Sequence, residues 1–165
     1  MLHDKKLIYA GAIVLGMNDA LVELTGTLSG IAFAFDKSIV VGLTGLIMGI
    51  AASLSMAGSA YLEAKENPSE LIKPLTYSLY TGISYILTTA ILVAPFFIFD
   101  SIMESLILMF ICAFIAIISY NFYISVAKDL SFTKRVLQMS AITFGVAIIS
   151  FLIGYLVKYY FGIEI

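Results

Sequence analysis

Charged residues are scarce in this sequence, and their scarcity excludes a soluble globular domain. Only 12% of the residues are charged and 61% are hydrophobic, with a mean hydropathy of +1.05. A soluble domain has about 45–50% apolar and roughly 25% charged residues. So few charges could not cover a surface that faces water, whereas a surface that faces lipid needs almost none. The composition therefore indicates a membrane protein.

Cysteine and histidine occur once each, as Cys112 and His3. A single thiol cannot form an intrachain disulfide, and neither residue has the spacing of a metal-binding cluster. Because His3 lies in the N-terminal tail, the chain also lacks the Asp/His cluster that a lipid-modifying enzyme would need. We therefore expect neither an enzyme nor a prosthetic group. The formal net charge of −2 offers nothing to a nucleic acid.

Five apolar runs are each long enough to cross a bilayer, which takes about 20 helical residues. They cover residues 7–35, 39–61, 74–99, 102–127 and 136–161. The links between them are short and polar, so the sequence predicts an all-α membrane protein of five antiparallel spans. No linker is long enough to separate domains, and we expect a single transmembrane domain over residues 1–165.

The placement of lysine and arginine predicts the orientation. Seven of the nine basic residues fall before the first run, between the second and third, or between the fourth and fifth. Because cytoplasmic loops carry the excess of Lys and Arg, we expect a cytoplasmic N-terminus and an external or lumenal C-terminus. The compact loops favour a prokaryotic plasma membrane, although a vacuolar membrane fits the same topology.

The first run contains three polar residues near its middle: Asn18, Asp19 and Glu23. A charged side chain at the centre of a bilayer costs about 2.5–3.5 kcal/mol on insertion scales. Asp19 and Glu23 share one helix face because they are four residues apart. No Lys or Arg lies at a similar depth in the sequence, which leaves a proton or a metal ion as the partner of these carboxyl groups. A protonated carboxyl bonded to a neighbouring helix is the alternative.

The second run adds a thioether among small polar residues, because Met56 follows Ser53 and Ser55 and precedes Ser59. Sulfur and oxygen ligands together suit a softer divalent metal better than Mg²⁺ or Ca²⁺. On its own, Met56 would be an ordinary packing residue. Glu63 lies seven residues after it on the same face, and we expect Glu63 and Glu66 at the cytoplasmic mouth of an ion path.

Two glycine pairs in these runs have the spacing of close helix contacts. They are Gly26 with Gly30, and Gly45 with Gly49. The pairs fit packing of the first helix on the second, and they also fit a dimer interface, and the motif does not choose between these.

The two polar helices resemble the vacuolar iron transporter family. Residues 13–21 read IVLGMNDAL, like the family's I-V-x-G-x-[NS]-D-G-L, and Gly45-Leu46 followed by ASLSMAG at 52–58 and by Tyr61 is like its second motif. The resemblance implies five spans, a homodimer, and transport of Fe²⁺ or Mn²⁺ out of the cytosol in exchange for protons. It also places the family's pathway aspartate on Asp19 and its pathway methionine on Met56.

This chain departs from the family at several acidic positions. Ala12, Met48 and Ala60 stand where many members have acids, Ala20 replaces a glycine, and the segment between the second and third runs lacks the long acidic insert. Glu23 is a candidate to take over part of a missing role. These departures keep open the alternative of a membrane metal sensor or assembly partner that does not transport.

Overall fold

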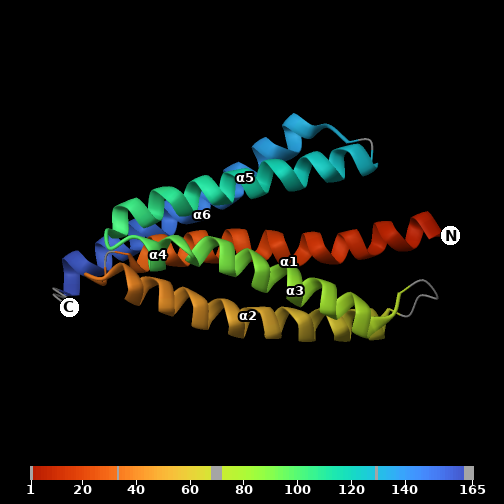
Figure 1. Cartoon of the computed structure of the whole chain (residues 1–165), viewed down its shortest axis with the longest axis horizontal. Helices are drawn as coiled ribbons and strands as arrows, with labels where there is room; N and C mark the ends of the chain where they lie inside the picture. The colour runs from red at the N-terminus through yellow and green to blue at the C-terminus, as the bar shows by residue number, and fades with distance from the viewer. Residues whose placement is uncertain (1, 33, 68–71, 129, 162–165) are drawn as a thin grey trace.

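The computed structural model describes residues 2–32, 34–67, 72–128 and 130–161. These residues form six α-helices and no strand, which confirms the all-α prediction. The helices are α1 (Leu2–Ile31), α2 (Ser38–Glu66), α3 (Pro74–Val93), α4 (Pro95–Ile98), α5 (Ile102–Lys128) and α6 (Phe132–Phe161). Five of them are long and run side by side, so α1 begins at one end of the bundle and α6 finishes at the other (Figure 1).

Four segments are long and apolar enough to cross a membrane: Ser38–Glu66, Pro74–Ile98, Ile102–Val126 and Phe132–Tyr160. Among the described residues, α1 does not join this group. Length and composition thus support four of the five predicted spans.

The helix ends differ from the predicted ends of the apolar runs. The first run extends to Phe35, but α1 ends at Ile31; conversely, α2 continues past Tyr61 to Glu66, and α6 begins at Phe132 rather than Val136. An apolar run marks residues that avoid water. A helix, in contrast, extends as far as its backbone N–H groups bond the carbonyl groups four residues earlier. The reversal after α1 is therefore built partly from apolar residues, and α2 and α6 keep their helical bonds into polar sequence.

The third predicted span is two helices, because Pro95 interrupts it. Proline has no N–H to donate and its ring crowds the preceding turn. The short α4 that follows is held by two hydroxyls: Ser105 Oγ donates to the carbonyl oxygen of Pro95 (3.2 Å) and Ser38 Oγ to that of Phe96 (3.1 Å). The two hydroxyl oxygens lie 2.8 Å apart, so either serine can instead donate to the other. This buried cluster joins the beginnings of α2 and α5 to α4.

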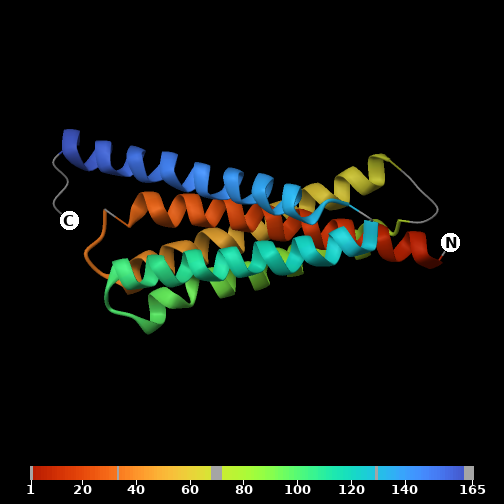
Figure 2. The ribbon, with the colours of Figure 1, turned by 90° about the horizontal axis from the view of Figure 1, so that it is seen from above.

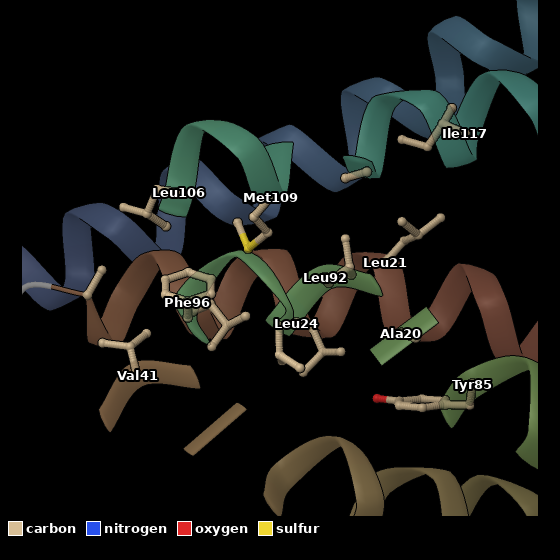
Figure 3. Close-up of a cluster of buried hydrophobic side chains, with 14 residues drawn as sticks. Ala20, Leu21, Leu24, Val41, Tyr85, Leu92, Phe96, Leu106, Met109 and Ile117 are labelled. Atoms are coloured by element: carbon tan, nitrogen blue, oxygen red, sulfur yellow. The ribbon is translucent and has the colours of Figure 1, made fainter. Parts of the chain in front are cut away.

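The core surrounds α1, although α1 is the most polar of the long helices in its middle. Leu21, Leu24 and Leu28 of α1 are fully buried. They belong to one cluster with residues of the other helices: Val41, Leu92, Phe96, Leu106, Met109 and Ile117. Figure 3 shows these side chains converging from α2, α3, α4 and α5 onto α1, and Figure 2 shows α6 alongside α1.

All four glycines of the predicted packing motifs face helices of the same chain. A Cβ at Gly26 would lie 2.9 Å from Val146, and one at Gly30 would lie 3.0 Å from the backbone of Ser150, so this pair packs α1 against α6. Gly45 faces Leu28 of α1 and Val93 of α3, and Gly49 faces Thr89 of α3. The first pair therefore packs α1 against α6, whereas the sequence suggested packing of the first helix on the second or a dimer interface.

Candidate metal-binding groove

A groove of about 500 Å³ lies between α1 and α2. Asp19 and Glu23 line it from α1, and their spacing of four residues places both carboxyl groups on the α2 side of that helix. The lining residues from α2 are Met48, Ala51, Ala52, Ser55, Met56 and Ser59. The structure thus brings together Asp19, Glu23 and Met56, three of the four residues expected along an ion path.

The two carboxyl groups have different surroundings. Asp19 is exposed at the open side of the groove, whereas Glu23 is half-buried and accepts a hydrogen bond of 2.5 Å from the hydroxyl of Tyr85. The Tyr85 side chain, from α3, is fully buried in the core cluster. A donor fixed by core packing restricts where the Glu23 carboxylate can lie, so one acid is oriented by the fold and the other is free to meet a ligand.

The α2 wall follows from helical spacing. Met48, Ser55, Met56 and Ser59 recur at intervals of seven, one and three residues, which keeps them on neighbouring parts of one face. Ser53, which the sequence grouped with these serines, is buried on another face and bonds the carbonyl of Ile50 at 2.8 Å. The polar stretch of the second helix is therefore divided, and only part of it reaches the groove.

Asn18 does not line the groove. Successive helical residues are about 100° apart, and Asn18 points to a separate pocket of about 150 Å³ on the other side of α1. That pocket is shared with Asn121 of α5 and with Arg135 and Gln138 of α6. Asn18 and Asp19 therefore do not line the same cavity, and the position of Asn18 does not support its expected place on the ion path.

Glu63 and Glu66 are exposed in the last turns of α2, past the groove residue Ser59. At 1.5 Å per residue, Glu63 is about 6 Å further along the helix than Ser59. This end of α2 lies at the same end of the bundle as the start of α1 (Figure 1). Both acids are therefore positioned beyond the groove rather than within it.

The groove offers a mixed set of ligand atoms. Two carboxyl groups, two thioethers and two hydroxyls line it. Within the described residues, no group of three or more His, Cys, Asp or Glu side chains could hold a metal ion. A cation here would thus be bound by few charged oxygens, supplemented by sulfur, hydroxyl or water oxygen.

Two residues of this site were not recognised as contributors from the sequence. Met48 appeared only as the replacement of an acid, although its spacing of eight from Met56 places both sulfur atoms on one face. Tyr85 contributes through a contact across 62 residues, which no local pattern reveals.

The helices and the groove define a multi-pass membrane protein with an acidic, sulfur-containing groove formed by its first two helices. Residues 10–68 match the model of the VIT family, and this stretch contains both walls of the groove. This matched stretch is similar to the VIT family, in line with the motifs around Asp19 and Met56. No curated protein matches the sequence. Members of that family are metal transporters rather than enzymes, and the long apolar helices of this chain support an integral membrane protein that crosses the bilayer several times.

Proposed function

We propose that this protein moves Fe²⁺ or Mn²⁺ out of the cytosol in exchange for protons, along the groove between α1 and α2. The observation that carries the proposal is the meeting of Asp19 and Glu23 with Met48 and Met56 in one groove between long membrane helices. Carboxylate oxygen alone would suit Mg²⁺ or Ca²⁺, whereas added thioether sulfur favours softer transition metals. The metal ion is the transported substrate.

Asp19 is the residue best placed to alternate between a proton and the metal. Burial in a membrane disfavours an unpaired carboxylate, so the group needs either a proton or a cation. When the metal binds, the proton must leave, and when the metal departs, a proton returns. This alternation couples the two ions without any further group. Glu23, oriented by Tyr85, supplies the second acidic oxygen.

We further propose that α1 is a fifth span, with its N-terminus in the cytosol. The polar centre of α1 is tolerable because its other faces are packed by the remaining helices, with Leu21, Leu24 and Leu28 fully buried. Polar residues within membranes face the bundle interior or a cavity. In this orientation Glu63 and Glu66 lie at the cytoplasmic mouth, and a prokaryotic plasma membrane is the proposed location.

A homodimer would cover the open side of the groove. In one protomer Asp19 is exposed, and a carboxyl group facing lipid would cost about 2.5–3.5 kcal/mol. Beside it, Ala51, Ser55 and Ser59 form a stripe of small residues at intervals of four, which permits close approach of another helix. The motif glycines are already used inside the protomer, so this stripe is the surface that we propose for the partner copy.

Liposomes that contain the purified protein and a dye quenched by Fe²⁺ or Mn²⁺ test this function. We expect the parent to take up metal, faster when the lumen is acidic, because protons leave as metal enters. Asp19→Asn should abolish uptake while the protein remains monodisperse. Uptake by Asp19→Asn at the parental rate would contradict the assignment of Asp19.

A membrane metal sensor or assembly partner that does not transport is the second candidate. Ala12 and Ala60 stand at acidic positions of the family and are buried, so the acids missing there have no counterpart at those places. A well-folded parent that binds Mn²⁺ but never moves it would favour this second candidate.

A further inference from the structure

The pocket on the other side of α1 carries a cation, Arg135, with no acidic partner among the described residues. Arg135 Nε donates to the Asn121 amide oxygen at 3.3 Å, and an Arg135 terminal amino group donates to the Tyr120 hydroxyl at 3.4 Å. Both acceptors are neutral and both distances are long for a guanidinium. No ion pair joins Arg135 to an acid among the residues that the structure describes.

This guanidinium is drawn into the helix bundle rather than toward water. Asn121 lies five residues before Val126, where the apolar stretch of α5 ends, and thus about 8 Å inside that stretch. Asn121 is almost fully buried and is itself fixed by a bond to the Ile117 carbonyl at 2.8 Å. A positive charge held at this depth by neutral groups leaves most of its donors available to an anion.

The other lining residues of this pocket suit a polar group that enters on the exposed side of α6. The pocket, of about 150 Å³, is also lined by Asn18 and Gln138, and the buried carbonyl oxygen of Asn18 accepts no hydrogen bond from the described residues. Gln138 and Ile142 are both lining residues and both exposed on α6. The opening therefore lies on the exposed side of α6, a helix long and apolar enough to cross a membrane, and combines an amide with an apolar side chain.

We propose that this pocket binds the phosphate of an anionic phospholipid, with Arg135 as the charged ligand and Asn18 accepting a headgroup hydroxyl. A guanidinium pairs with phosphate through two parallel hydrogen bonds, and basic pockets between membrane helices recognise lipid headgroups. Lys134, exposed beside Arg135, adds positive charge at the same end of α6. The site does not depend on metal transport and lies on the face of α1 that is turned away from the groove.

Native mass spectrometry of the purified protein with phosphatidylglycerol, and with phosphatidylcholine of the same acyl chains, tests the proposal. We expect preferential retention of phosphatidylglycerol, and a loss of about tenfold in Arg135→Gln, since a charge enclosed in a pocket contributes more than a basic residue near a membrane surface. Lys134→Gln removes the same charge one residue away and should change retention less than about twofold.

A second pair of variants protects the test if Arg135→Gln does not fold. Gln138→Trp should close the pocket from its exposed side and lower retention, whereas Leu137→Trp, on the neighbouring exposed position outside the pocket, should not. Equal retention of the two lipids, unchanged retention in both pocket variants, or displacement of the lipid by millimolar inorganic phosphate would each overturn the proposal.

Discussion

The two sides of α1 carry chemistry of opposite sign. On the α2 side, Asp19 and Glu23 face thioethers and hydroxyls in an open groove. On the α5 and α6 side, Asn18 meets Arg135 in a smaller pocket with no acid among its lining residues. Asn18 and Asp19 are adjacent in the sequence, so a rotation of about 100° separates the two environments. A single central helix thus keeps an acidic groove and a cationic side chain apart.

The neighbouring residues Asp19 and Asn18 provide the largest expected contrast. Asp19→Asn removes a charged oxygen from the groove. We expect Mn²⁺ affinity to fall by about 100-fold or more, since losing even an outer partner of a metal ligand costs about 10–100-fold. Asn18→Ala, which changes the other side of α1, should alter affinity by less than about threefold. Calorimetric titration of both variants measures the contrast. Equal losses would mean that the two sides act as one site.

On one side, α1 packs closely against α6, and Gly154 of α6 lies at this contact. A Cβ at Gly154 would collide with the backbone of Gly30, which cannot move aside as a side chain could. Gly154→Ala should destabilise the protein by about 2 kcal/mol, within the usual cost of overpacking. Gly145→Ala, in the same helix but with nothing within 4 Å, should be neutral or stabilising. Thermal unfolding in detergent compares them, and equal midpoints would contradict this packing.

The sulfur atoms of the groove should set the choice of metal more than the strength of binding. Met48→Leu with Met56→Leu keeps the apolar volume but removes both thioethers, and such swaps usually preserve the fold. We expect the preference for Fe²⁺ or Mn²⁺ over Mg²⁺ to fall by about tenfold, because hard oxygens remain. Competition titrations measure the preference. An unchanged ratio would show that the thioethers only pack.

The sequence predicted the acidic wall of the groove better than it predicted the neighbours of that wall. The spacing of Asp19 and Glu23 and the motif around Met56 are local, and periodicity places them on helix faces without knowledge of the fold. Which helix each face meets is not local. Gly26 and Gly30 pack against α6, and Asn18 shares a pocket with Arg135. Both contacts arise because α1 lies in the middle of the bundle and contacts several helices.

The break at Pro95 shows a similar limit in the fold itself. Hydropathy treats residues 74–99 as one run because Pro95 is flanked by apolar residues, and only the missing N–H of proline marks the end of α3. The hydroxyls of Ser38 and Ser105 that hold the following turn come from distant parts of the chain. The residues next to Ser38 and Ser105 in the sequence do not indicate that these hydroxyls bond the backbone of α4.

The smallest expected effect concerns the contact between Tyr85 and Glu23. Tyr85→Phe keeps the buried ring and removes only the hydroxyl that Glu23 accepts from. The freed carboxylate should sample more positions and bind metal about fivefold more weakly, consistent with a loss of about 1 kcal/mol per hydrogen bond. Tyr80→Phe makes the same chemical change at an exposed position of α3 and should leave affinity unchanged. If Glu23 is a ligand, Tyr85→Phe should have no further effect once Glu23 is replaced by Gln. Additive losses in that double variant would instead mean that the Tyr85 hydroxyl acts independently of Glu23, and the acidic side of α1 would then depend on Asp19 without an oriented second acid.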